Sequence, residues 1–341
     1  MSEVARLAKV SQSTVSHVIN GTRRVDPATE QAVRDAIAAT GYFKDDIARS
    51  LRSGKTQTIG LAMSAMTNLY FGEVVHAIER DVSNAGYTLL FADTHDDPKH
   101  EARVVTELLS RRVDAMIVAP SQTGDSTLDM LSRRAIPTMV IDRIPPTLHV
   151  GIDTVGVYNE RPTADLDAHL VGHGHRRIAM ITSDRRFTTT TERVAGYRLG
   201  LEDAQIEWDP ELVKVGIEGL ETVALRAFDE LLELKDPPTA IVMGNNQVSI
   251  ATITAMQKHG MVPPDDMALV AFDDFPWAGL FSPKLTAMAQ PIDDLGGRAV
   301  TLLLERIANP DLAIRNERLQ PTLVVRESCG CVSPPVRVTK T

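Results

Sequence analysis

The sequence has few of the residues that build disulfide frameworks or base-stacking surfaces. Only two of its 341 residues are cysteines, Cys329 and Cys331, and aromatic residues make up 4% of the chain. Two cysteines separated by a single glycine are too few and too close for a disulfide framework, so we expect inert thiols in a reducing compartment. The scarcity of aromatic residues argues against a surface that binds nucleic acid mainly by stacking bases.

Long apolar runs are also missing. The longest, such as Ala115–Pro120, are far shorter than the roughly 18 residues that span a bilayer, and residues 1–10 lack the apolar core of a secretory signal. We therefore expect a cytoplasmic protein without membrane contact. The 43% apolar and 24% charged residues are ordinary for a globular protein, and the length corresponds to two or three folded units.

Basic residues are outnumbered, with 36 Lys and Arg against 45 Asp and Glu, which gives a net charge of −9. This sign argues against a polyanionic partner if the charge is spread evenly. However, residues 1–55 contain nine basic and six acidic residues and sum to +3, which leaves −12 for the rest of the chain. Such an asymmetry indicates nucleic-acid contact by the basic segment.

The first forty residues predict three short helices. The first spans Ser2–Lys9, and Ser11 is a good N-cap for the second, Gln12–Asn20. A third helix is predicted over Pro27–Thr40. The second helix has an apolar face and an opposite face of uncharged hydrogen-bonding side chains. Two short helices joined by a tight turn, the second with such a face, indicate a helix-turn-helix.

The rest of the chain alternates short apolar runs with amphipathic stretches. Strands are predicted to begin near Ile59, Tyr87, Asp114 and Pro137, and again near Arg177, Leu212, Ala240 and Ala268. A repeated strand–helix unit of about 28 residues predicts parallel sheets with right-handed crossovers. We therefore expect an α/β protein, with the helix-turn-helix headpiece followed by two doubly wound parallel-sheet subdomains and a cleft between them.

Ligands of open parallel sheets gather beyond the carboxyl ends of the strands. Here those ends carry carboxylates, amides and arginines, with aromatic side chains nearby. This mixture suits a small polyhydroxylated or charged ligand held by charge-assisted hydrogen bonds. The residues that follow the predicted strands include Tyr70, Phe71, Asp142, Arg143, Ser183, Phe187, Asn245 and Asp273.

Ala5–Gly21, together with Gly41-Tyr42 and Ala48–Gly54, resembles the DNA-binding headpiece of the lactose/galactose repressor (LacI/GalR) family. Further landmarks extend this resemblance over nearly the whole chain, namely Ile59–Leu61, Ile141–Arg143, Gly172–Ile178, Glu192–Gly196, Phe272–Asp274 and Val325–Ser328. The resemblance implies the fold of periplasmic sugar-binding proteins, in which the chain crosses between subdomains three times. The crossings would fall near Asp153–Val157, Ala287–Pro291 and Leu319–Thr322.

The resemblance also implies how DNA is bound. The second helix would lie in the major groove, and a hinge helix, Ile47–Ser53, would place Leu51 as a wedge in the minor groove. His17 stands where the family usually has Arg, and Lys9 stands where Gly is common in the turn. The implied DNA-contacting residues are Ser11, Gln12, Ser13, Thr14, Ser16, His17, Asn20, Arg49 and Leu51.

The family's effector-contacting positions correspond to Asp142, Arg193, Asn245 and Asp273, with Tyr70 and Phe71 nearby. Asn246 replaces a usual Asp and so removes a charge from the cleft wall. We expect a sugar-like effector of unspecified identity and no cofactor.

The expected domains are a headpiece at 1–45, a hinge and linker at 46–57, an effector-binding and dimerisation domain at 58–330, and a flexible tail at 331–341. Subdomain one would comprise about 58–154 plus 290–319, and subdomain two about 155–287 plus 320–330. In a homodimer, two headpieces would address the halves of a pseudopalindromic operator. Effector binding would then bias the hinge and change operator affinity.

Other classes of function fit less well. A sugar-binding transport protein explains only the body, and an enzyme needs a nucleophile or acid–base motif that the sequence lacks. A ligand-controlled DNA-binding repressor explains both parts, and a cytosolic ligand-binding protein with a vestigial headpiece is the alternative. The spacing of His169, His173 and His175 suggests zinc, but no Cys or Glu completes the set along the sequence, so we expect no metal.

Overall fold

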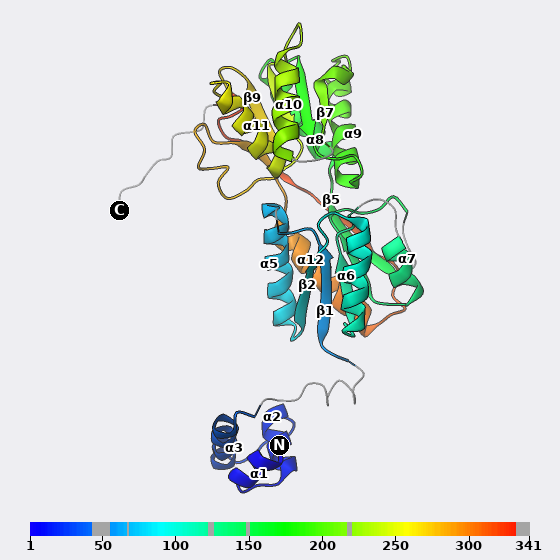
Figure 1. Ribbon diagram of the computed structural model, residues 1–341, viewed down its shortest axis with the longest axis vertical. Helices are drawn as coiled ribbons and strands as arrows, with labels where there is room; N and C mark the ends of the chain where they lie inside the picture. Colours follow the sequence, from blue (N-terminus) through cyan, green and yellow to red (C-terminus); the bar gives the residue numbers. More distant parts are fainter. Residues whose placement is uncertain (43–54, 67, 122–125, 148–150, 217–219, 332–341) are drawn as a thin grey trace, which may run out of the picture. The chain divides into compact units, whose positions relative to one another are not determined.

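The computed structural model describes residues 1–42, 55–66, 68–121, 126–147, 151–216 and 220–331 (Figure 1). The predicted hinge helix and most of the predicted tail lie outside these residues. The chain forms two compact units that divide after Thr56, and each is described by itself.

The N-terminal unit consists of α1 (Ser2–Leu7), α2 (Gln12–Asn20) and α3 (Pro27–Thr40). The Ser11 hydroxyl caps α2 by accepting a hydrogen bond from the backbone N–H of Thr14 at 3.2 Å. Apolar side chains from the three helices form one small core, which contains Val4, Ala5, Val15, Val33 and Ala36. This packing confirms the predicted helix-turn-helix and orients the polar face of α2 away from the core.

The first sheet of the C-terminal unit has six parallel strands in the order β11-β5-β4-β3-β1-β2. Their bounds are β1 Thr58–Met63, β2 Thr88–Asp93, β3 Ala115–Val118, β4 Thr138–Ile141, β5 Ile152–Val157 and β11 Asn316–Leu319. The helices of this subdomain are α5 Leu69–Asn84, α6 Pro98–Ser110, α7 Ser126–Arg133 and α12 Ile292–Ala308. Side chains of α5 and α12 pack together against one face of the sheet.

The second sheet has the order β12-β10-β9-β8-β6-β7, and β12 is antiparallel to β10. The strands are β6 Ile178–Thr182, β7 Val213–Val215, β8 Ala240–Met243, β9 Ala268–Phe272, β10 Thr286–Ala289 and β12 Thr322–Val324. A short 3-10 helix, Pro210–Leu212, precedes β7. The α-helices are α8 Glu160–Gly172, α9 Thr188–Asp203, α10 Leu220–Leu232 and α11 Asn246–Lys258.

The eight predicted strand starts each lie within one residue of an observed start. The agreement arises because most of these strands are buried on both faces and therefore form continuous apolar runs, such as Ala115–Val118. The two-sheet α/β fold is thereby confirmed. The chain passes between the sheets after β5, after β10 and after β11.

No helix in the described ranges combines the length and the apolar character that a membrane span requires.

Candidate functional site

The first candidate surface is the polar face of α2. Gln12 and Ser13 are exposed at its start, whereas Val15 is buried in the core. The Ser11 hydroxyl contacts the hydroxyls of Ser13 (2.7 Å) and Thr14 (2.9 Å), so it is used within the turn. Uncharged groups at the start of this helix can form hydrogen bonds with base edges in a major groove.

Of the remaining predicted DNA-contacting residues, some are half-buried and two lie outside the described residues. His17 is half-buried, and its Nδ1 lies 2.9 Å from the Thr22 hydroxyl. Ser16 is half-buried on the same helix, and Asn20 is its last residue. Arg49 and Leu51 lie outside the described residues. Lys9, at the position where Gly is common, has a positive φ of +54°.

The second candidate site is a cavity of about 80 Å³ between the two sheets of the C-terminal unit. All six side chains predicted to contact an effector line this one cavity. Its lining residues are Asn68, Tyr70, Phe71, Asp96, Asp142, Arg143, Ser183, Phe187, Thr189, Arg193, Asn245, Gln247, Asp273 and Gln290.

Two aspartates occupy corresponding places in the two subdomains. Asp142 follows β4 and Asp273 follows β9, and both have left-handed backbones, with φ of +61° and +75°. A residue other than glycine is strained there, although aspartate tolerates it better than most residues. The strained turn directs each carboxylate into the cavity, where both are almost fully buried.

Tyr70 joins the two aspartates through a shared hydrogen-bond network. Its hydroxyl lies 2.9 Å from Asp142 Oδ1 and 3.0 Å from Gln290 Oε1, and the Gln290 amide donates to Asp273 Oδ1 at 2.6 Å. Burial raises the pKa of Tyr70 well above its usual value, and the two carboxylates raise it further. The phenol therefore stays protonated and remains a hydrogen-bond donor. Burial also raises the pKa of Asp142, although Arg143 and Arg193 oppose this effect.

Arg193 is held by contacts on several sides of its guanidinium. The group donates to the carbonyl oxygen of Gly244 at 2.7 Å and to Asn159 Oδ1 at 2.9 Å. It also stacks on the Phe272 ring at 3.7 Å and lies 3.7 Å from Asp273 Oδ1. A planar cation fixed on an aromatic ring presents its donors in a defined direction.

The cleft is closed by contacts between its two walls. The Asn246 amide donates to Asn68 Oδ1 at 3.0 Å, and the Arg143 guanidinium stacks on Phe187 at 3.9 Å. Pockets for drug-sized ligands measure roughly 300–1,000 Å³, so a sugar-sized molecule requires the walls to separate. The Asn246 Oδ1 atom is buried without a hydrogen-bond partner among the described residues, and a ligand or an opened cleft could satisfy it.

The cavity residues that sequence reasoning missed include Gln290, Thr189 and Asp96. Gln290 lies within the predicted second crossing, so its place at the cleft could have been inferred from that prediction. Asp96 belongs to an acidic loop, and it pairs with the buried Arg143. No local pattern identifies that pairing, because it joins residues 47 positions apart.

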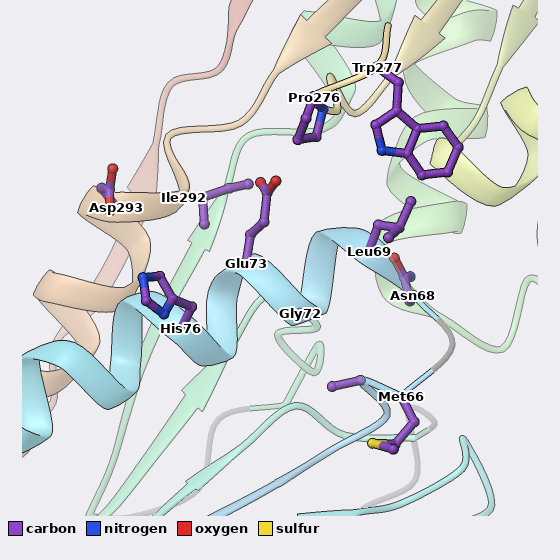
Figure 2. Close-up of a pocket in the computed structure, with 11 residues that line it drawn as sticks. Met66, Asn68, Leu69, Gly72, Glu73, His76, Pro276, Trp277, Ile292 and Asp293 are labelled. Carbon is purple, nitrogen blue, oxygen red and sulfur yellow. The ribbon is translucent and has the colours of Figure 1, made fainter.

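A larger groove of about 690 Å³ runs along α5 and reaches both subdomains (Figure 2). Leu69, Glu73 and His76 of α5 line it, and Pro276 and Trp277 stand across from them (Figure 2). Exposed large apolar side chains gather there, with Met66 75%, Leu69 41% and Trp277 41% exposed. Apolar side chains at such a groove are typical of an interaction surface.

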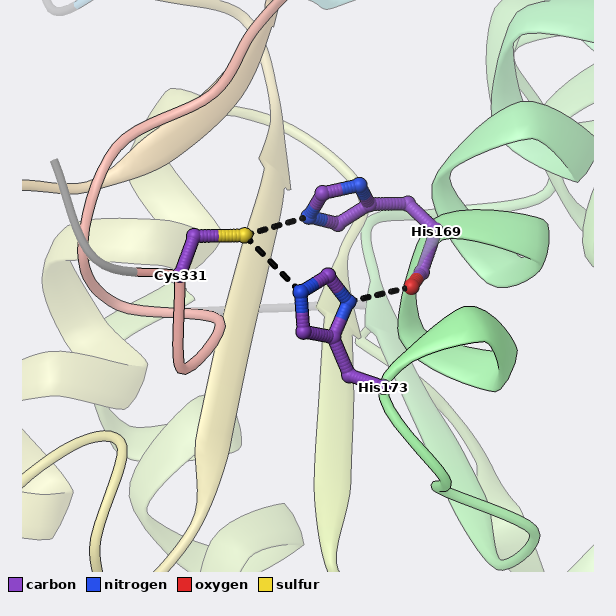
Figure 3. Close-up of side chains that lie close together, drawn as sticks. All are labelled: His169, His173 and Cys331. Atoms are coloured by element: carbon purple, nitrogen blue, oxygen red, sulfur yellow. Dashed lines mark hydrogen bonds between the residues drawn. The ribbon is translucent and has the colours of Figure 1, made fainter. Parts of the chain in front are cut away.

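A third cluster corrects the sequence-based reasoning about metal ligands. Cys331 Sγ lies 3.5 Å from His169 Nε2 and 3.0 Å from His173 Nε2 (Figure 3). The expectation that no cysteine completes the histidine set is therefore wrong. The reason is that Cys331 is 158 residues away from His173 along the chain and returns to α8 only after β12. His175 makes a different contact, with Nδ1 2.9 Å from the Thr239 hydroxyl.

Comparisons with known proteins agree with both units. Residues 1–45 match the sequence profile of bacterial regulatory proteins of the lacI family, and residues 168–329 match the periplasmic binding protein-like domain. The HTH-type transcriptional repressor PurR of Aliivibrio fischeri (strain MJ11) is 33% identical over 329 residues, which cover 96% of this chain and 97% of that protein. PurR of Photobacterium profundum is 32% identical over 327 residues, with the same coverage.

Solved structures give the same picture. A complex of the transcriptional regulator CelR with cellobiose has a TM-score of 0.74 and 27% identity, covering 96% of this chain and 98% of that one. The lac repressor dimer bound to operator and the anti-inducer ONPF has a TM-score of 0.81 over 96% and 97% of the two chains, and at 23% identity it shows the shared fold alone. This chain therefore belongs to the lacI family of bacterial regulatory proteins, which join a DNA-binding helix-turn-helix to a periplasmic-binding-protein-like ligand domain.

Proposed function

We propose that this chain is a cytoplasmic transcriptional repressor that binds operator DNA and is controlled by a small polyhydroxylated ligand in the cleft. One observation carries the proposal: the cavity gathers carboxylates, amides, guanidinium groups and aromatic rings from both subdomains. Such a lining holds sugar-like molecules by charge-assisted hydrogen bonds with an aromatic ring against one face. We assign these groups to holding a ligand and not to catalysis.

The N-terminal unit supplies the DNA contacts. Gln12 and Ser13 are exposed at the start of α2, and Arg23 and Arg24 are exposed after its end, where they can reach phosphates. Leu51 is proposed as the minor-groove wedge. The other proposed contacts are Ser11, Thr14, Ser16, His17, Asn20 and Arg49.

The contacts at the crossings offer a route from ligand to DNA affinity. Asn159 lies just after β5, where it accepts a hydrogen bond from Arg193 and donates to Glu192 at 2.6 Å. Glu192 also pairs at 2.9 Å with Arg318, which lies just before the third crossing. A ligand that draws Arg193 away would therefore alter bonds that set the angle between the subdomains, and this change would bias operator affinity.

We further propose that the groove along α5 is covered by a second copy of the chain. The groove reaches both subdomains and carries exposed apolar side chains of both, Leu69 and Trp277. A symmetric dimer formed there would present two headpieces to the two halves of a pseudopalindromic operator.

The test is selection of binding sites from random duplex DNA by the full chain, followed by anisotropy titrations at fixed salt. We expect one pseudopalindromic sequence, bound about 10³-fold or more tightly than random DNA. Gln12→Ala should relax the preference at one base of each half-site and cost about 1–3 kcal/mol, because the exposed amide no longer pairs with a base edge.

Gln31→Ala is the matched control, since Gln31 is an exposed glutamine on α3 that donates to Asp35 at 2.9 Å. This variant should bind like the wild type. If a folded chain enriches no sequence, the headpiece is vestigial and the chain is a ligand-binding protein.

A further inference from the structure

The last turn of α8 and the segment after β12 form a cluster that the proposed function does not use. His169 lies in α8, His173 caps its C-terminal end, and both rings face Cys331 (Figure 3). The three candidate ligand atoms, one from each residue, lie within 4.8 Å of one another. His169 and Cys331 are partly buried and His173 is exposed, so the cluster is open to ions from solvent.

The distances fit a metal centre. Zinc binds sulfur at about 2.3 Å and imidazole nitrogen at about 2.0–2.1 Å, so a tetrahedral ion separates these ligand atoms by about 3.5 Å. The observed separations from Cys331 Sγ are 3.5 Å to His169 Nε2 and 3.0 Å to His173 Nε2. The two imidazole nitrogens lie within 4.8 Å of each other, and a tetrahedral ion would bring them to about 3.4 Å, so rotation of the imidazole rings accompanies binding.

A second hydrogen bond prepares His173 as a ligand. Its Nδ1 lies 2.8 Å from the carbonyl oxygen of His169, which can only accept, so Nδ1 carries the ring proton. In the neutral ring, Nε2 then has a free lone pair, and this atom faces Cys331 Sγ. Metal-binding histidines are held in the same way, with the second nitrogen donating to a carbonyl or carboxylate.

Without a metal, the three side chains of the cluster can form only weak hydrogen bonds through the Cys331 sulfur. A thiol has one proton, so Cys331 can donate to only one of the two imidazoles that approach its sulfur. The other imidazole must donate to sulfur, which is a weak acceptor. A cation that replaces the thiol proton would instead engage all three side chains at once.

From this geometry we propose that His169 Nε2, His173 Nε2 and Cys331 Sγ bind one zinc ion, with water in the fourth position. One thiolate and two imidazoles are a ligand set that suits zinc and disfavours the oxygen-seeking ions magnesium and calcium. On binding, the Cys331 thiol releases its proton to solvent as the sulfur–zinc bond forms. No electron is transferred.

The site would tie together two chain segments that leave the crossings. His169 lies in α8, the helix that follows the first crossing, and His173 is the C-terminal cap of that helix. Cys331 lies in the segment that follows the third crossing. Cys329 is buried two residues earlier, near the Thr286 hydroxyl (3.2 Å), and anchors this segment to β10. A bound ion would therefore stabilise the second subdomain at its C-terminal end.

The test uses the full chain without a histidine tag, reduced and freed of metal, and titrated with zinc chloride against a chromophoric chelator. We expect one tight site per chain, a higher melting temperature with zinc, and thiolate-to-metal charge-transfer absorption when cobalt(II) replaces zinc. Substitution of a residue that only supports a metal ligand lowers metal affinity roughly 10- to 100-fold. Cys331→Ser and His173→Ala each remove a direct ligand, so each should lower zinc affinity by more than that. Cys331→Ser should also lose the charge-transfer band.

His175→Gln is the matched control, because this nearby histidine contacts Thr239 instead. It should bind zinc as tightly as the wild type. All variants should melt like the metal-free wild type in chelator, which would show that they are folded. Equal zinc affinity in wild type and Cys331→Ser, or cobalt binding without a thiolate band, would overturn the proposal.

Discussion

The ligand cleft depends on a few buried side chains that share their hydrogen bonds. Tyr70, Asp142, Gln290 and Asp273 form one connected series that extends from the first subdomain to the second. Because each member is fixed by the next, the cavity presents a preformed set of donors and acceptors. A ligand that enters must replace these bonds with its own, which favours molecules that carry several hydroxyl groups.

One buried carboxylate outside the cleft has no such partners. Asp167 of α8 is fully buried, and neither of its oxygens has a hydrogen-bond partner among the described residues. It packs against Gly200 of α9, and burial raises its pKa well above the usual value.

We predict that Asp167→Asn stabilises the protein by about 1–3 kcal/mol at pH 7–8, because an uncharged amide is cheaper to bury than a carboxylate. In the folded state the pKa of Asp167 lies above its unfolded value of about 3.9. The free energy of unfolding of the wild type, relative to that of the variant, therefore falls as the pH rises from the unfolded pKa to the folded one. Urea unfolding at pH 4 and pH 8 measures this change.

Asp165→Asn is the control, since Asp165 is a half-buried residue of the same helix whose carboxylate pairs with Arg161 at 3.0 Å. Its effect should stay within about 0.5 kcal/mol at either pH. If the difference in free energy of unfolding between wild type and Asp167→Asn is the same at pH 4 and pH 8, Asp167 does not have a raised pKa in the folded state.

At the residue scale, the sequence predicted the cleft better than the cysteine cluster. Asp142 and Asp273 directly follow apolar strands, so the rule that ligands bind at strand ends was sufficient to find them. Gln290 meets Tyr70 across 220 positions, and Cys331 meets His173 across 158. Contacts at such separations depend on the final path of the chain, which no local pattern records.

At the scale of elements, the position of α5 depends on its close packing with α12. A Cβ atom added at Gly296 of α12 would lie 2.7 Å from Ala77 Cβ and 3.2 Å from backbone atoms of α5. The next residue, Gly297, would meet only the flexible carboxylate of Asp81, at 3.1 Å. Two adjacent glycines of one helix therefore have opposite tolerance for a side chain.

We predict that Gly296→Ala lowers the free energy of unfolding by about 1–3 kcal/mol, because α12 must move away from α5. Gly297→Ala should leave it unchanged or raise it by up to about 1 kcal/mol, because alanine favours the helix. Denaturant unfolding of the two variants measures both effects. Equal destabilisation by the two substitutions would contradict the packing argument.

The sequence predicted eight of the twelve strands in the described residues and missed the other four. The eight strands that were found follow the predicted strand–helix repeat, and they include the edge strands β2 and β7. The other four strands fall outside this repeat, although β5 and β10 lie in the interior of the sheets. β5, β10, β11 and β12 were read only as crossings, and β11 and β12 contain polar residues and lie at sheet edges. Edge strands expose one side to solvent, so their apolar signal is weak.

At the scale of the whole molecule, the net charge of −9 divides into a basic headpiece and a strongly acidic body. The acidic body repels DNA, and only the basic headpieces attract it. This charge distribution favours specific over non-specific DNA binding. Two headpieces act together only if the chain is a dimer.

We predict that Leu280→Glu separates the proposed dimer. Leu280 is 82% exposed, and its backbone N–H donates to the carbonyl oxygen of Trp277 at 2.7 Å, so it neighbours the groove along α5. A buried charge at that surface would be unpaired and costly. Sedimentation should show a halved mass at micromolar concentration, and operator affinity should fall.

Ile314→Glu is the control, because Ile314 is also exposed but precedes β11, at the edge of the first sheet opposite β2. It should sediment like the wild type. If Leu280→Glu does so as well, the groove is not the dimer surface.

The central claim is that a ligand in the cleft controls DNA affinity. The most direct measurement is the operator Kd of the full chain with and without a ligand. The ligand is taken from thermal-shift screening of sugars, sugar phosphates and nucleosides. We predict a change of about 5- to 150-fold in the wild type and no change in Arg193→Ala, with operator binding itself intact. A ligand that binds through Arg193 yet leaves the operator Kd unchanged would contradict the account.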